Sequence, residues 1–141
     1  MEKDIQLLKK IYDGTKIGSK SLNAILPSID NPALRRAIIT QICEYDRINT
    51  DAKSQLSNMG EKSSSPPLSA FMAVAEAKIN TAVDSSPSHI AEMVIKGSNM
   101  GIINITKELN KAKGSNPTTY NLGRKLLKTE EENIFRIKSF L

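Results

Sequence analysis

The chain has 141 residues, which suits one compact domain, and its 39% apolar and 25% charged residues are typical of a soluble globular protein. One cysteine cannot form an internal disulfide, and one histidine excludes a multi-histidine metal or catalytic site. The net charge is +5, but the basic residues are scattered along the chain, which argues against nucleic-acid binding. The apolar stretches are too short for a signal peptide or a spanning helix, so we expect no membrane association and a soluble cytoplasmic protein.

Residues 1–60 are predicted to form an antiparallel helical hairpin. Apolar and small residues recur three and four positions apart in the first helix, which ends near Pro27 because a proline disfavours helical geometry at the preceding residue. Asn31 and Pro32 provide an N-cap and a first-turn proline for the second helix, which ends at Gly60. The side chains expected to face inward from this second helix are Leu34, Ile38, Ile42, Tyr45, Ile48, Ala52 and Leu56.

Residues 61–87 are predicted to form a polar linker and a short crossover helix. The apolar positions of this helix are Leu68, Phe71, Met72, Ala75, Ile79 and Val83. A second hairpin is expected over residues 88–141, with one helix from about 89 to 110 and another that Asn116 and Pro117 open. No segment shows the alternation of a β-strand, so the sequence predicts a single all-α domain.

The two predicted hairpins are similar in sequence. A shift of 83 positions places Gly14 and Gly18 on Gly97 and Gly101. A shift of 85 positions places the Asn31–Pro32 pair on Asn116–Pro117. The two-residue difference falls in the hairpin turns, where insertions are tolerated, so the chain is predicted to contain one helical hairpin twice.

The paired glycines are predicted to mark sites of close helix packing. A glycine inside a helix costs about 1 kcal/mol relative to alanine, so four of them at equivalent positions need a reason. We interpret Gly14, Gly18, Gly97 and Gly101 as helix-packing positions. The alternative is that they leave room for a bulky ligand.

Two hairpins joined by one long crossover is the connectivity of ferritin-like bundles. On this organisation the chain resembles the ferritin-like superfamily, including its rubrerythrin and bacterioferritin relatives. The string from His89 to Ile103 and the run from Glu130 to Ile134 are similar to a branch of small bacterial bundle proteins. The resemblance implies a four-helix bundle with a short fifth helix in the crossover, and it implies no particular activity.

Metal-bearing members of this superfamily bind a di-iron centre with a glutamate on one helix of each hairpin and Glu-x-x-His on the other. The matching strings here are Glu44-x-x-Arg47 and Glu130-x-x-Asn133, and neither contains the histidine. Lys96 stands at a position where the partner helix would supply a ligand. We therefore expect neither the di-iron centre nor any other cofactor.

His89 and Glu92 form a weaker metal candidate at the start of the fourth helix. Residues three apart lie on one helical face, so His-x-x-Glu can hold one metal ion. A lone histidine at such a place more often caps the helix or packs against its neighbours. Glu130 is a further candidate ligand.

Glu130 is predicted to point into the bundle. It belongs to a seam with Gly123, Leu127 and Ile137, and the repeat pairs it with Tyr45. A buried carboxylate is costly unless it is hydrogen-bonded or paired, and burial should raise its pKa. We expect a polar cluster, which is either structural or a retained binding or proton-handling site, formed by Tyr12, Tyr45, Asn104 and Glu130.

Two functional hypotheses follow. The first is a non-catalytic ferritin-like bundle that acts as an interaction or structural module. Its contact surface for a second copy or another protein would be the crossover helix, with Phe71, Met72, Ile79 and Val83. The second hypothesis is a divergent metal-binding or oxidoreductase protein with a carboxylate site around Glu130.

Overall fold

Five α-helices and two short 3-10 helices make up the described part of the chain. The computed structural model describes the backbone of residues 1–63, 66 and 68–141, and the side chains of these residues except 68–73 and 75. In chain order the elements are α1 (Glu2–Ile25), η1 (Leu26–Ser28), α2 (Pro32–Asn58), α3 (Leu68–Val83), α4 (Pro87–Lys111), α5 (Pro117–Ile137) and η2 (Lys138–Phe140). Over these residues the all-α prediction is confirmed.

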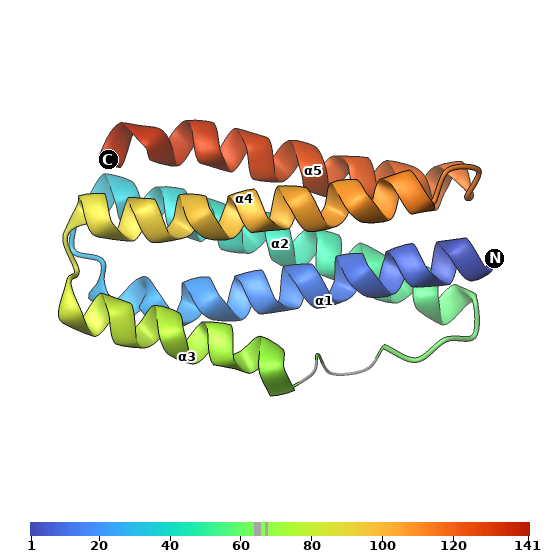
Figure 1. Ribbon diagram of the computed structural model, residues 1–141, viewed down its shortest axis with the longest axis horizontal. Coiled ribbons are helices and arrows are strands. Elements are labelled where there is room, and N and C mark those ends of the chain that lie inside the picture. Colours follow the sequence, from blue (N-terminus) through green and yellow to red (C-terminus); the bar gives the residue numbers. More distant parts are fainter. Residues whose placement is uncertain (64–65, 67) are drawn as a thin grey trace.

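The long helices form two antiparallel pairs. Helix α1 packs chiefly on α2, and α4 packs chiefly on α5. Figure 1 shows that α2 and α4 run in the same direction, because the linker and α3 carry the chain back along the length of the bundle. Helix α3 lies outside the four long helices and packs mainly on α1.

Side-chain caps begin three of the helices where the sequence predicts them. The Asn31 side chain accepts a hydrogen bond from the Leu34 backbone N–H at 2.9 Å. The Asn116 side chain accepts from Thr118 N–H at 2.9 Å, and the Ser86 hydroxyl accepts from His89 N–H at 3.3 Å. Each of these caps precedes a first-turn proline, which lacks the N–H that a helix start leaves unpaired.

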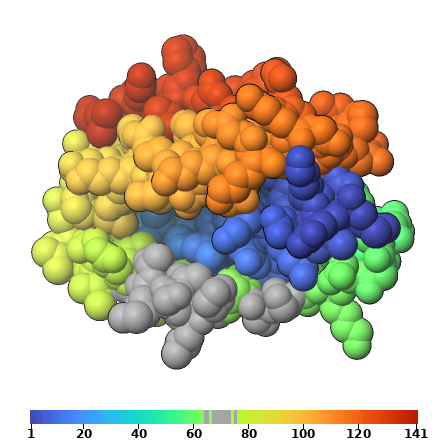
Figure 2. Space-filling view, turned by 45° about the vertical axis from the view of Figure 1, so that its right-hand side comes forward, coloured from blue at the N-terminus to red at the C-terminus, as the bar shows by residue number. Residues whose placement is uncertain are grey.

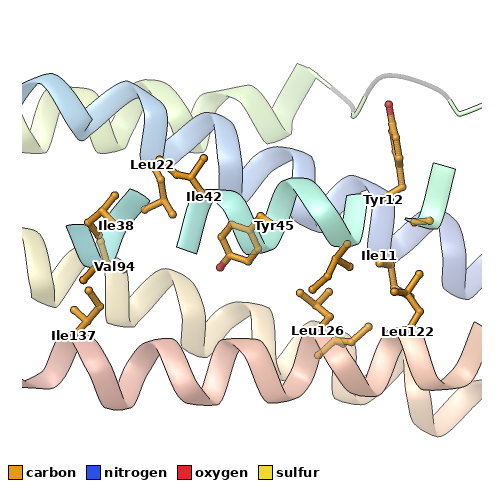
Figure 3. Close-up of a cluster of buried hydrophobic side chains, with 14 of the residues drawn as sticks. Ile11, Tyr12, Leu22, Ile38, Ile42, Tyr45, Val94, Leu122, Leu126 and Ile137 are labelled. Atoms are coloured by element: carbon orange, nitrogen blue, oxygen red, sulfur yellow. The ribbon is translucent and has the colours of Figure 1, made fainter. Parts of the chain in front are cut away.

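The core lies between α1, α2, α4 and α5 (Figure 3). All seven inward positions predicted for α2 are buried. The prediction for α5 is less accurate, because Leu127 is only half-buried whereas Leu126 is buried. The buried face of α5 is therefore rotated from the predicted seam, although it still includes Glu130. The largest fully buried apolar side chains are Leu7, Leu8, Ile11, Ile25, Leu34, Ile38, Ile48, Leu56, Ile90 and Ile137.

The crossover helix is formed where the sequence predicts it. Its bounds, Leu68–Val83, match the predicted range. Ile79 and Val83 are 64% and 84% exposed, so these two side chains do not contribute to the core. Phe71 and Met72, which belong to the same predicted contact surface, lie outside the residues whose side chains the structure describes. Within the described part of the chain, no helix combines the length and the apolar character needed to cross a membrane.

Candidate functional site

A groove runs between α1 and α4, and Glu76, Ala77 and Asn80 of α3 also line it. Its larger part has a volume of about 440 Å³, and a continuation toward the N-terminal half of α1 has about 370 Å³. Figure 2 shows the lighter-blue, C-terminal part of α1 set back beneath the yellow-to-orange α4. Volumes of this size are typical of small-molecule sites. The residues that line both parts are Gly14, Ile17, Tyr45, Gly101, Asn104 and Glu130.

The groove exists because two glycines leave its walls without side chains. A Cβ atom added at Gly14 or at Gly97 would meet no atom of a described residue within 4 Å. The described residues show no close packing at these two glycines, so the helix-packing interpretation stays a prediction for them. The alternative, that they leave room, agrees with the structure.

The other two glycines accommodate buried side chains. A Cβ at Gly18 would lie 2.7 Å from Cε2 of the Tyr45 ring, and a Cβ at Gly101 would overlap the Glu130 carboxylate. Tyr45 belongs to α2 and Glu130 to α5, so each glycine makes space for the partner helix of its own hairpin. Gly18 and Gly101 are thus packing positions, but for a side chain and not for a neighbouring helix backbone.

Four polar side chains from three helices form the floor of the groove. The Tyr45 hydroxyl donates a hydrogen bond to Oε1 of Glu130. The Gln41 amide nitrogen donates to the Tyr45 hydroxyl and to the Ser98 hydroxyl, both at 3.0 Å. All four side chains are buried, and Glu130 is only 4% exposed. The network joins α2 to α4 and α5 at mid-bundle.

The two acids of this network have strongly shifted pKa values. Burial raises the pKa of Glu130 to about 7, the hydrogen bond from Tyr45 opposes this, and the nearby Glu44 charge adds to it. Burial, together with the adjacent Glu130 charge, raises the pKa of Tyr45 far above its ordinary value. Tyr45 therefore keeps its proton near neutral pH, while Glu130 changes charge there.

One buried acceptor in the floor has no hydrogen-bond partner among the described residues. When Glu130 is ionised, it accepts the single proton of the Tyr45 hydroxyl, so Gln41 meets that hydroxyl with its NH₂ group. This fixes the orientation of the Gln41 amide, and its Oε1 atom is left buried without a hydrogen bond. Gln41 is 1% exposed and lines the groove. A buried unpaired carbonyl costs about 1–3 kcal/mol, and a groove occupant that donates a hydrogen bond would remove this cost.

The structure places two members of the predicted cluster elsewhere. Tyr45 and Glu130 meet as predicted, but the Tyr12 hydroxyl accepts from the Lys16 ammonium at 3.2 Å and points away from the core (Figure 3). Asn104 lines the groove but is exposed. Tyr12 is still buried, at 6% exposure, but its hydroxyl does not reach Glu130. Asn104 was expected inside because it lies near the apolar seam of α4, where a rotation of some tens of degrees decides burial.

Sequence reasoning missed Gln41 and Ser98. Gln41 lies four residues before Tyr45 on α2, so the two share one helical face. That spacing from a predicted inward tyrosine was a usable signal. Ser98 directly follows Gly97 and has no comparable mark in the sequence, because its burial depends on how α4 is rotated toward α2.

The metal candidates are not brought together. The Nδ1 atom of His89 lies 4.0 Å from the Asp84 carboxylate, and Glu92 forms an ion pair with Lys96 at 3.1 Å. Glu130 has polar but no acidic or imidazole partners in the floor. In the part of the chain that the structure describes, no three histidine, cysteine, aspartate or glutamate side chains are arranged to hold a metal ion.

The chain was compared with protein-family models, with curated proteins and with solved structures, and none of the three comparisons finds a match.

Proposed function

We propose that the chain is a non-catalytic helical bundle of ferritin-like connectivity that binds a small molecule in the groove between α1 and α4. The observation that carries this proposal is the coincidence of open space with unsatisfied chemistry. Gly14 and Gly97 keep the walls open, while Gln41 Oε1 and the Glu130 carboxylate lie on the floor. The network is too sparse in acid–base pairs and metal ligands to favour an enzyme.

The connectivity supports the ferritin-like part of the proposal. The parallel course of α2 and α4 requires a crossover along the whole bundle, as in ferritin-like folds. The contacts also follow the predicted repeat, because Gly18 faces Tyr45 in one hairpin and Gly101 faces Glu130 in the other. A bacterial origin rests on the sequence resemblance. A cytoplasmic location is supported by the lone exposed Cys43, since free thiols persist in reducing compartments.

Blocking the groove tests the proposal. A Gly97→Leu side chain would project into open space, so the variant should fold and fill part of the groove. The matched control is Asn99→Leu on an exposed position of the same helix that does not line the groove. Amide chemical shifts of the ¹⁵N-labelled chain would be followed during titration with phenylpropylamine, phenylpropanol and phenylpropanoate, which share one body and differ in head group. We expect at least one probe to cause saturable shifts of groove residues. These shifts should disappear in Gly97→Leu and remain in Asn99→Leu. The absence of binding by all three probes would overturn the proposal.

We also propose that α3 contributes a contact surface for a second copy of the chain. Ile79 and Val83 lie one helical turn apart, and both are strongly exposed. Sedimentation equilibrium should detect a dimer that Ile79→Asp dissociates, whereas Lys78→Asp at a neighbouring exposed position should not. A monomeric natural chain would refute this interface.

A further inference from the structure

The hydrogen bonds already made within the groove floor indicate which ligand groups it could bind. Tyr45 and both protons of the Gln41 amide are used within the network, and Ser98 alone has a hydroxyl proton to give. Two acceptors are left: Gln41 Oε1, which is unpaired, and Glu130 Oε2, which faces Gly101 at the groove wall. A complementary ligand head group must therefore donate at least two hydrogen bonds.

The charge of the floor points to a cation. No lysine, arginine or histidine among the described residues forms an ion pair with Glu130. Glu44, the nearest acid, is engaged by Asn133 at 3.0 Å and by Arg136 at 3.7 Å. The charged side chains on the walls and rim balance one another, three lysines against three carboxylates, so Glu130 provides the uncompensated charge. These rim residues are Lys10, Lys96, Lys107, Asp13, Glu76 and Glu108.

The walls require an apolar body on the same molecule. Most of the surface that lines the larger part of the groove comes from aliphatic and thioether side chains, which gain nothing from a hydrated inorganic ion. These side chains belong to Ile17, Leu22, Ile25, Met93, Val94 and Met100.

We infer that the groove binds a primary or secondary organic amine, whose ammonium group lies between Glu130 and Gln41 and whose apolar body lies along α1 and α4. This inference rests on the proposed function and names the ligand class for that site. A primary ammonium supplies three N–H donors and a secondary ammonium two, enough to bond to both free acceptors, whereas a quaternary ammonium supplies none. The site should therefore discriminate between cations of equal charge.

The three probes named above separate this inference from the proposed function. For the natural chain, phenylpropylamine should bind at least about tenfold more tightly than phenylpropanol, and phenylpropanoate should bind most weakly, because a charge-assisted hydrogen bond is about twice as strong as a neutral one. The trimethylammonium analogue of the amine should bind no better than the alcohol. Equal binding of alcohol and amine, or preference for the carboxylate, would overturn the inference and leave the proposed function standing. No binding by any probe would overturn both.

The variant Glu130→Gln tests which residue holds the ammonium group. It keeps the side-chain shape and removes the charge, so amine affinity should fall to that of the alcohol, while alcohol affinity stays unchanged. Asp13→Asn is the matched control, since Asp13 lines the same groove nearer its mouth. If Asp13→Asn abolishes amine binding and Glu130→Gln does not, the ammonium lies at the rim and the inference is wrong. The probe comparison on the natural chain decides the matter even if a variant fails to fold.

The pH dependence of binding gives an independent readout. Glu130 has a pKa raised to about 7, so amine affinity should weaken as the pH falls below 7, by up to about tenfold per pH unit. The alcohol should show no such dependence. The measurement should cover about pH 5.5 to 8, a range that brackets the Glu130 pKa of about 7. An amine affinity that stays constant over this range would contradict the assignment of Glu130. The other titratable or charged groups that face the groove from the surrounding helices are Tyr45 and the neighbouring Glu44 on α2, Lys10 and Asp13 on α1, Glu76 on α3, and Lys96, Lys107 and Glu108 on α4.

Discussion

The four glycines of α1 and α4 permit a sharp test of the groove geometry. Gly14 and Gly18 lie one turn apart on α1, so alanine has the same intrinsic helical advantage at both positions. A Cβ at Gly14 meets no atom of the described residues within 4 Å, whereas a Cβ at Gly18 lies 2.7 Å from one Tyr45 ring atom and 3.1 Å from two others. The Tyr45 ring is 5% exposed and its hydroxyl is bonded to Glu130, so it cannot move away without disturbing the floor.

The two substitutions should therefore change the free energy of unfolding in opposite directions. Gly14→Ala should stabilise the chain by up to about 1 kcal/mol, the helix-propensity difference between the residues. Gly18→Ala gains the same term but adds an overpacking penalty of about 1–3 kcal/mol, so a net loss of about 1 kcal/mol is expected. The variants should thus differ by about 2 kcal/mol, or roughly 6 °C in Tm for a domain of this size.

Urea unfolding followed by circular dichroism measures this difference. The comparison requires that both variants and the natural chain have equal m-values. Equal stabilisation by both alanines would mean that the Tyr45 ring yields freely, and the packing described for the floor would be wrong. Destabilisation by Gly14→Ala would mean that the wall at this position is closed, and the groove itself would be in doubt.

Three further outcomes are expected. The pKa of Glu130 is about 7 in the folded chain and 4.5 ordinarily, so the unfolded chain loses this proton at lower pH. The free energy of unfolding should therefore fall by about 3 kcal/mol as the pH rises from 4.5 to above 7. Glu130→Gln should remove this pH dependence, as measured by urea unfolding. Asn133→Ala should cost about 2 kcal/mol because it removes a buried amide that joins α5 to α2, whereas Asn121→Ala on the exposed face of α5 should cost less than about 0.5 kcal/mol in the same assay. Zinc at millimolar concentration should not raise the Tm, since His89 and Glu92 pair with different neighbours; a rise that His89→Ala abolishes would contradict the separation of these residues.

Local sequence rules account for most of the helical framework. Helix α2 begins at a proline behind a capping asparagine, and its seven inward positions follow from spacing alone, because a long helix with one apolar stripe has only one way to bury it. The pairing of Tyr45 with Glu130 also follows from the sequence, through the repeat. Each of these features depends on information within one helix or on equivalence between two hairpins.

Features that depend on the rotation of one helix against another could not be predicted. The shift from Leu127 to Leu126 at the centre of α5 is about 100° around the helix, and it depends on the size of the side chains at the crossing points. The same uncertainty placed Asn104 inside. The role of the glycines could not be decided from the sequence for a related reason: a missing side chain permits either close approach or open space, and only the neighbouring helix decides between them.

The groove is also where several energetic costs coincide. Gly14 and Gly97 each cost about 1 kcal/mol relative to alanine, and no described atom packs closely against either of them. The unpaired carbonyl of Gln41 costs about 1–3 kcal/mol, and ionising Glu130 near neutral pH costs more. Outside the groove, Thr119 pairs with Gln55 at 3.0 Å, whereas His89 Nε2 and Ser115 Oγ are buried without a hydrogen bond to a described residue, so it is the coincidence of several costs that sets the groove apart. Apolar residues in the floor and alanines in the walls would give a more stable bundle of the same shape, so these costs are better explained by an occupant that satisfies them than by the needs of the fold.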